Sequence, residues 1–266
     1  MKLCRFTHKT LPEPSYGIVE DDYVRPLIDA DAFGARPRVH SNRIPLSEVK
    51  LLAPVTPSKI VCVGRNYREH AAELGNPMPT EPLLFLKAPT AIIGHKDAIR
   101  LPLESVQVEH EGELGVVIGR VASRLTDEQD ALSYVLGYTC VNDVTARDLQ
   151  RKDVQFTRAK SFDTFCPVGP YIATDINPSD LAVTTRVNGA IKQHARTSTM
   201  AFSVATLLRY ISRMMTLLPG DLIATGTPAG VSRLDGGDVV EVEVEGVGVL
   251  QNTVLDGGAE QSSSNP

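Results

Sequence analysis

The stretch Glu111-Gly-Glu-Leu-Gly-Val-Val-Ile-Gly119 decides the fold, because its apolar second half predicts a β-strand buried inside a sheet. Successive side chains of a strand point to opposite faces. Glu111 and Glu113 lie two residues apart, so both carboxylates project from the same face. Two like charges held that close require a cation nearby.

Asp143 offers a third carboxylate. It follows the apolar run 138–141, so it can reach Glu111 and Glu113 from a neighbouring strand. Hard divalent ions such as Mg²⁺, Mn²⁺ or Ca²⁺ prefer carboxylate oxygens. The three acids therefore predict a divalent metal site. The alternative is a solvated strand face, where most carboxylates lie.

Composition limits the class of protein. The chain has 266 residues, of which 42% are hydrophobic and 22% charged, enough for one large domain or a large and a small one. A net charge of -5 argues against a nucleic-acid partner. The amino terminus lacks a signal peptide pattern, no segment approaches a membrane span, and the four cysteines form no CxxC pair. We expect a cytoplasmic protein with no membrane partner.

The chain divides into three parts. Residues 1–55 alternate short strand patterns, at 2–6, 16–20 and 23–27, with turn signals, and predict a small β-rich N-terminal lobe. Prolines near residue 55 open a second unit, which we expect to be the catalytic domain over residues 56–257. Residues 258–266 are small and polar and predict a disordered tail.

Strands also dominate the second unit. The predicted strands are residues 59–63, 83–86, 113–118, 137–141, 168–173, 183–187, 222–225, 239–244 and 247–250. Asn188-Gly189 between two of them is a hairpin signal. Helical patterns occur at residues 126–134 and 202–215. Strands and helices do not alternate regularly, so we predict a mixed, mostly β (α+β) fold with a few helices packed outside.

Basic and polar residues accompany the acids. Arg147 and Gln150 lie three apart on a predicted helical turn, where both can bind an acyl oxygen or a distal carboxylate. Lys160 and Lys87 add positive charge that would attract an acidic substrate, although a lysine taken alone is more often a surface cation; the motif around Lys160 favours substrate binding there. In Thr225-Gly-Thr-Pro-Ala-Gly230, backbone amides and the Thr227 hydroxyl could bind a carboxylate. The alternative for that stretch is an ordinary turn.

His70 and Glu73 fall at helical spacing in residues 66–75, before a proline-rich segment. A histidine oriented by a carboxylate can serve as a general base that activates water. The segment could also be a lid that orders on substrate binding, or a solvated surface helix carrying an incidental pair.

In this order and spacing, the motifs resemble those of the fumarylacetoacetate hydrolase family. The stretches that carry the resemblance are Val63-Gly-Arg-Asn-Tyr67 with His70 and Glu73, Phe85-Leu-Lys87, Glu111-Gly-Glu113, Asn142-Asp-Val-Thr-Ala-Arg147, Ala159-Lys-Ser-Phe-Asp163 and Thr225-Gly-Thr-Pro-Ala-Gly230. The likeness covers residues 59–254 and is strongest to small acylpyruvases, 2-oxo acid decarboxylases and dienedioate isomerases. It implies rolled mixed β-sheets of the family's C-terminal domain type, a Mg²⁺ or Mn²⁺ site and usually a homodimer.

A 2-oxo acid fits such a metal site, because its carboxylate and keto oxygens can chelate the ion. We expect hydrolysis of an acylpyruvate-type, fumarylpyruvate-like substrate, since His70 and Glu73 can activate water. One alternative is decarboxylation of an oxaloacetate-type acid, for which the metal suffices. Another is isomerisation or decarboxylation of an unsaturated dicarboxylate of the 2-hydroxyhepta-2,4-diene-1,7-dioate type. The complete set of acids and bases disfavours a binding protein without turnover.

Overall fold

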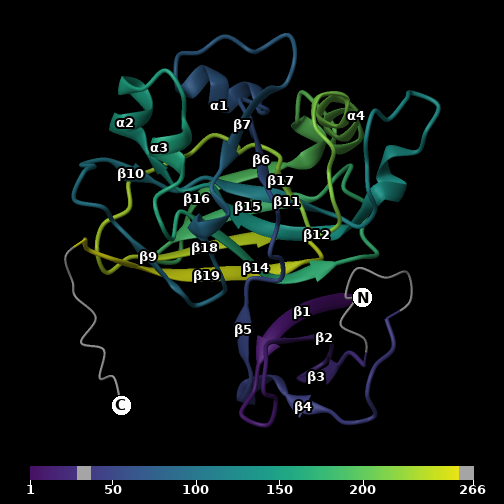
Figure 1. Ribbon diagram of the computed structural model, residues 1–266. Coiled ribbons are helices and arrows are strands. Elements are labelled where there is room, and N and C mark those ends of the chain that lie inside the picture. Colours follow the sequence, from purple (N-terminus) through teal and green to yellow (C-terminus); the bar gives the residue numbers. More distant parts are fainter. Residues whose placement is uncertain (29–36, 258–266) are drawn as a thin grey trace.

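Strands make up most of the computed structural model, which describes residues 1–28 and 37–257. The chain forms a large mixed sheet, a smaller sheet packed against it, and short helices on the side away from the N-terminal strands (Figure 1). The mixed, mostly β fold class expected from the sequence is confirmed. The tail expected at residues 258–266 lies outside the described residues.

The large sheet has twelve strands in the order β4-β3-β2-β1-β14-β12-β11-β17-β6-β7, with β5 paired to β1 and β8 to β14. Their bounds are β1 Lys2–Thr7, β2 Ser15–Glu20, β3 Tyr23–Pro26, β4 Ile44–Pro45, β5 Lys50–Leu52, β6 Ile60–Gly64, β7 Leu83–Lys87, β8 Ile92–Ile93, β11 Gly112–Ile118, β12 Val135–Asn142, β14 Cys166–Ala173 and β17 Leu222–Ala224.

The N-terminal strands extend this sheet. Lys2 and Leu3 of β1 lie opposite Ala173 and Ile172 of β14, so the hydrogen-bonded ladder runs from the N-terminal segment into the rest of the molecule. The β-rich character expected of residues 1–55 is therefore present, without a separate sheet among the described residues. The boundary at residue 55 stays a prediction.

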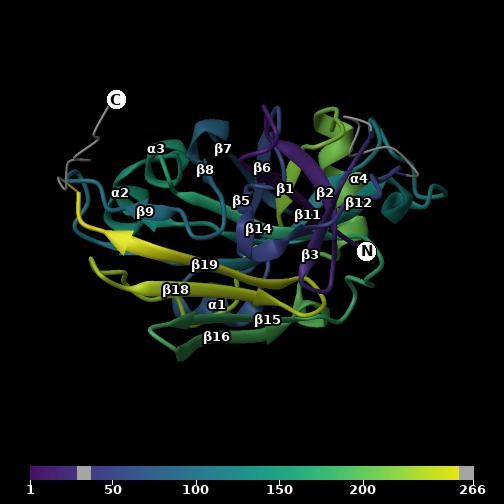
Figure 2. The ribbon, with the colours of Figure 1, turned by 90° about the horizontal axis from the view of Figure 1, so that it is seen from below.

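A smaller sheet of five strands, in the order β16-β15-β18-β19-β9, packs beneath the large one (Figure 2). The bounds are β9 Ala98–Arg100, β15 Ala182–Val187, β16 Ala190–Arg196, β18 Val239–Val244 and β19 Gly248–Leu255, while β10 Val108–Glu109 pairs with β13 Thr145–Ala146. The hairpin expected at Asn188-Gly189 is confirmed. It joins β15 to β16, and both residues have positive φ, as a tight hairpin requires.

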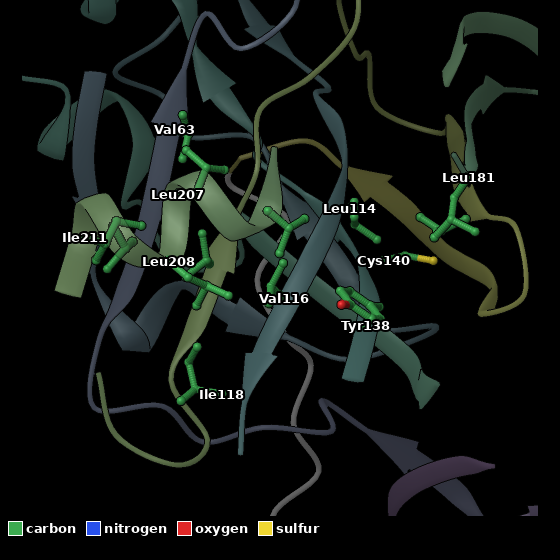
Figure 3. Packing of buried hydrophobic residues seen from close by; sticks show 14 of the residues in the cluster. Val63, Leu114, Val116, Ile118, Tyr138, Cys140, Leu181, Leu207, Leu208 and Ile211 are labelled. Atoms are coloured by element: carbon green, nitrogen blue, oxygen red, sulfur yellow. The ribbon is translucent and has the colours of Figure 1, made fainter. Parts of the chain in front are cut away.

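Strand β11 is buried on both faces. Leu114 and Val116 pack into a core that includes residues of the smaller sheet and Leu208 of the helix α4, Val204–Met214 (Figure 3). On the opposite face, Val117 packs into a second core with Val141 of β12. A slip of one residue would exchange these faces, so burial fixes the register of β11 and with it the direction of the acids at its start.

Helices are short. The bounds are α1 Arg68–Glu73, α2 Arg147–Lys152, α3 Thr157–Lys160 and α4 Val204–Met214, and the 3₁₀ turns are η1 Leu46–Glu48, η2 Pro89–Ala91, η3 Ala131–Tyr134 and η4 Thr197–Thr199. The helix expected at residues 202–215 is confirmed as α4. Ser203 caps it by accepting a hydrogen bond from the Thr206 amide. No helix in residues 1–28 or 37–257 has the length and apolar character needed to cross a membrane.

The helix predicted at residues 126–134 is wrong over its first half. Only Ala131–Tyr134 is helical, as a 3₁₀ turn that begins where the Asp130 carboxylate accepts a hydrogen bond from the Leu132 amide. Residues 126–130 are all exposed and have no apolar face to bury. Without such packing, a segment this short does not stay helical in water.

The packing of α4 predicts the effect of a core substitution. Leu208 is 0% exposed, whereas Met214 on the same helix is 55% exposed. We expect Leu208→Ala to lower the free energy of unfolding by about 2 to 5 kcal/mol, since it leaves a cavity. Met214→Ala, the matched control, should change it by less than about 0.5 kcal/mol. Urea denaturation measures both, and equal effects would contradict this packing.

Candidate active site

Three carboxylates meet where β11 begins and β12 ends. Gly112 lies opposite Asn142, and the Asp143 amide donates a hydrogen bond of 2.8 Å to the Glu111 carbonyl, so the ladder continues through the acids. Glu111, Glu113 and Asp143 are 5%, 2% and 1% exposed. One oxygen from each lies within 4.8 Å of the others. The structure thus brings together all three expected metal ligands, and the alternative of a solvated strand face is wrong for these acids.

Two lysines neutralise part of this charge. Lys160, at the end of α3, donates 2.7 Å hydrogen bonds to both Glu111 and Asp143. Burial disfavours its charged form, but those two carboxylates hold the pKa of Lys160 above its usual value. Lys87, at the end of β7, donates to Asp143 at 2.5 Å and to the Val144 carbonyl at 3.2 Å. Lys160 lines the neighbouring cavity, whereas Lys87 lies behind Asp143.

Arg147, the first residue of α2, is held by three partners. Its Nε donates to Glu109 at 2.7 Å, and its two terminal nitrogens donate to the Gln150 side-chain oxygen at 2.6 Å and to Glu111. Burial opposes ionisation of Glu111, yet Lys160 and Arg147 hold its pKa below the usual range. Arg147 and Gln150 both line the cavity as expected. Arg147 is occupied with acids, so its binding of a substrate carboxylate stays a prediction.

The charges at this site do not balance. Four buried acids, Glu109, Glu111, Glu113 and Asp143, face three buried cations, Lys87, Arg147 and Lys160. Among the described residues, Glu113 forms no ion pair and accepts only the 2.7 Å hydrogen bond from the Gly226 amide. Burial, together with the carboxylates of Asp143 and Glu111, raises the pKa of Glu113 well above its usual value.

This excess negative charge fits a divalent cation. The donors are all carboxylate oxygens, which hard ions such as Mg²⁺ and Mn²⁺ prefer, and they already lie close together. A bound cation would also remove the repulsion that raises the pKa of Glu113. The buried acidic triad is therefore able to hold a metal ion, whose identity the donor set leaves open.

The loop after β17 supports the acids. The Gly226 amide binds Glu113, and Gly226 has φ +99°, where an added Cβ would lie 2.7 Å from Cβ of Asn66. The Thr227 hydroxyl donates to the Gly112 carbonyl at 2.9 Å and accepts a hydrogen bond of 2.7 Å from Gln193. Thr227 lines the cavity. Since its hydroxyl already fixes the start of β11, the expected binding of a substrate carboxylate by Thr227 stays a prediction.

His70 and Glu73 form a pair on α1. Nδ1 of His70 lies 3.1 Å from Glu73, whose other oxygen accepts a 3.0 Å hydrogen bond from the Gly230 amide. His70 is only 5% exposed and lines the same cavity as the three acids. This placement does not fit the alternative of a solvated surface helix. The role of the pair in catalysis stays a prediction.

The cavity beside the acids has a volume of about 230 Å³. Several residues that shape it were not among the site residues expected from the sequence. Phe85 and Phe156 pack edge to face with ring centres 5.5 Å apart, and the Lys160 ammonium lies 5.1 Å from the centre of the Phe85 ring. Phe156 belongs to no periodic pattern. Asn66 is fully buried and donates to the Phe202 and Thr225 carbonyls, which fixes the segment that leads into α1.

The chain is similar to known proteins over most of its length. Residues 59–255 match the family described as Fumarylacetoacetate (FAA) hydrolase C-terminal, and residues 1–54 match the one described as Rv2993c-like, N-terminal. The chain is 45% identical over 224 residues to "Oxaloacetate tautomerase YisK" of Bacillus subtilis, which covers 79% of this chain and 74% of that protein. It is 37% identical to "Oxaloacetate tautomerase fahd2, mitochondrial" of Xenopus laevis, over 96% of this chain and 90% of that protein.

Among solved structures, that of 2-hydroxyhepta-2,4-diene-1,7-dioate isomerase from Mycobacterium marinum superposes with a TM-score of 0.88. It shares 46% sequence identity and covers 97% of this chain and 99% of its own. The family resemblance inferred from the motifs is confirmed.

The charge imbalance predicts opposite effects of one substitution. At neutral pH, burial of Glu113 costs either an unpaired charge or the uptake of a proton on folding, and Glu113→Gln removes that cost, so the metal-free variant should melt at a higher temperature than the native protein. The same change removes a metal ligand, so Mn²⁺ or Mg²⁺ affinity should fall by more than about tenfold, with a smaller metal-dependent rise in melting temperature. Differential scanning calorimetry with and without metal measures both effects.

Glu241→Gln on β18 is the matched control, because that side chain is only partly buried and lies outside the cavity. Glu241→Gln should change neither the melting temperature of the metal-free protein nor the affinity for the metal ion. An undiminished metal response in Glu113→Gln would remove Glu113 from the ligands.

Proposed function

The chain belongs to the fumarylacetoacetate hydrolase family, whose members are enzymes, and we propose that it is a tautomerase. It would interconvert the enol and keto forms of a short 2-oxo dicarboxylic acid of the oxaloacetate class by moving one proton. The observation that carries this proposal is the placement of His70 and the three carboxylates on one cavity of about 230 Å³. Ligand pockets commonly span about 300 to 1,000 Å³, so this cavity favours a ligand with few carbons.

His70 has the arrangement of a general acid and base. An ionised Glu73 can only accept a hydrogen bond, so Nδ1 of a neutral imidazole carries the proton and Nε2 carries the lone pair. Nε2 forms no hydrogen bond among the described residues. It is therefore free to take the proton from the enol oxygen of the substrate and return one to the adjacent carbon. One proton leaves and one is added, so no co-substrate is needed.

The carboxylates Glu111, Glu113 and Asp143 would hold the divalent ion, which supplies polarisation of the 2-oxo carbonyl when bound. Lys160 uses two of its three ammonium protons on Glu111 and Asp143. The third is available for a substrate oxygen, where a fixed positive charge favours the developing enolate. The two phenylalanines that line the cavity limit access of water.

Hydrolysis of an acylpyruvate is the second candidate. The observation that favours it is the same pair, because a neutral His70 oriented by Glu73 can also take a proton from water. Decarboxylation of oxaloacetate and isomerisation of an unsaturated dicarboxylate would use the same enolate chemistry at this site. The relatives named as tautomerases and as a dienedioate isomerase support proton transfer as the common step.

The test is a substrate panel with added Mg²⁺ or Mn²⁺. It follows loss of enol absorbance for oxaloacetate and for acylpyruvates, and pyruvate formation for decarboxylation and hydrolysis. We expect tautomerisation of oxaloacetate well above the buffer rate to be the fastest reaction. Faster hydrolysis of acylpyruvates would make the second candidate the function, and no turnover of any 2-oxo acid would reject both.

The proposed role of His70 gives a quantitative prediction. His70→Ala should slow tautomerisation by roughly 10²- to 10⁴-fold, the usual contribution of a general acid or base. Oxalate, whose oxygens can chelate a divalent ion, should still raise the melting temperature of the variant when Mg²⁺ is present, because the three carboxylates are intact. Glu69→Gln, at an exposed position of the same helix, is the matched control and should keep full activity. Full activity in His70→Ala would exclude it as the proton carrier.

A further inference from the structure

Arg65 differs from the other basic residues that line the cavity. Arg147 and Lys160 are bound to acids, and Arg151 donates a 3.0 Å hydrogen bond to Gln107. Within residues 1–28 and 37–257, the side chain of Arg65 has neither a hydrogen bond nor an ion pair, although it is partly buried. A guanidinium carries five donors in a planar fork and stays charged, so its position at the cavity favours an anionic partner.

The backbone at Arg65 supports a role for its side chain. Arg65 lies between β6 and α1 with φ +58°, a left-handed conformation that most residues avoid. Glycine would adopt this conformation without strain. Arg65 combines this backbone conformation with a side chain that lines the cavity, which supports a role for the side chain at the site.

Arg65 also lines a second hollow. This hollow of about 370 Å³ lies between the proline-rich segment after α1 and residues of α4. Arg65 and Leu83 line both hollows, whereas Glu111, Glu113 and Asp143 line the first alone. A ligand that is bound at the acids and extends toward the second hollow would pass Arg65.

We propose that Arg65 binds the distal carboxylate of the substrate and selects 2-oxo dicarboxylic acids over monocarboxylic ones. This inference rests on the proposed function and specifies the substrate class of that site. The fork of a guanidinium matches the two oxygens of a carboxylate. Glu81 lines the outer hollow and hydrogen-bonds the Tyr210 hydroxyl, so negative charge there repels a dianion that would extend past Arg65. The preferred substrate is thus short and carries its second carboxylate at Arg65.

The test compares binding of three ligands by calorimetry in Mg²⁺. Oxalate probes the metal end alone, 2-oxoglutarate adds a distal carboxylate, and 2-oxopentanoate has the same number of carbons without it. The native protein should prefer 2-oxoglutarate over 2-oxopentanoate by about tenfold or more, the worth of a charge-assisted hydrogen-bonded pair. Arg65→Gln should reduce this preference to about twofold or less while oxalate affinity stays within about twofold.

Two further variants separate ligand binding from a structural role. Arg65→Gly relieves the left-handed strain, so it should lose the preference while keeping or raising the melting temperature. Arg151→Gln, the matched control at another cavity arginine, should keep the preference.

The outcomes distinguish failure of the proposed function from failure of the role proposed for Arg65. If the native protein binds neither oxalate nor the 2-oxo acids in Mg²⁺, the proposed function fails and this inference fails with it. If the native protein binds them and Arg65→Gln keeps the tenfold preference, Arg65 alone is excluded. Equal losses of oxalate and 2-oxoglutarate binding in Arg65→Gln would show a structural role instead and overturn the proposal.

Discussion

The antiparallel pairing of β11 with β12 is the constraint on which the site depends. It places Gly112 opposite Asn142, and the acids on either side of this pair then face the same way into one small space. Cores on both faces of β11 hold that register, so the repulsion among the carboxylates cannot be relieved by a slip of the strand. The stability of the sheet is thus what keeps like charges close enough to bind a cation.

Much of the surrounding chemistry follows from that concentrated charge. Arg147 and the two lysines come from three separate elements, and each donates to an acid. An unpaired buried carboxylate is costly, so these cations allow the cluster to exist in a folded protein. They leave Glu113 without a cation among the described residues, and a divalent ion would compensate this residual charge. The basic residues nearest the acids thus position the acids, whatever they also contribute to substrate binding.

The sequence predicted the fold class and the acidic cluster because both depend on local patterns. The largely apolar run 114–118 sets the strand, and the two-residue spacing sets the shared face of Glu111 and Glu113. The sequence could not show which partners the basic and polar side chains of the site bind. Arg147 and Thr227 have the chemistry to bind a substrate, but their engagement with Glu109, Glu111 and Gly112 comes from long-range packing. The helix predicted at 126–134 also depended on tertiary packing. Only Ala131–Tyr134 is helical, because residues 126–130 are exposed and have no face to bury.

The way His70 and Glu73 are held on α1 suits a cavity in which tautomerisation, hydrolysis and decarboxylation would share one proton-transfer step. His70 is fixed by Glu73, which the Gly230 amide fixes in turn, so the imidazole is anchored to the loop that also holds Glu113. His70 and the acidic cluster therefore share one support. Whether the proton comes from an enol, a carbon or a water molecule then depends on which ligand fills the remaining space. Under the role proposed for Arg65, that choice is made where Arg65 lines both hollows, rather than at the acids and His70.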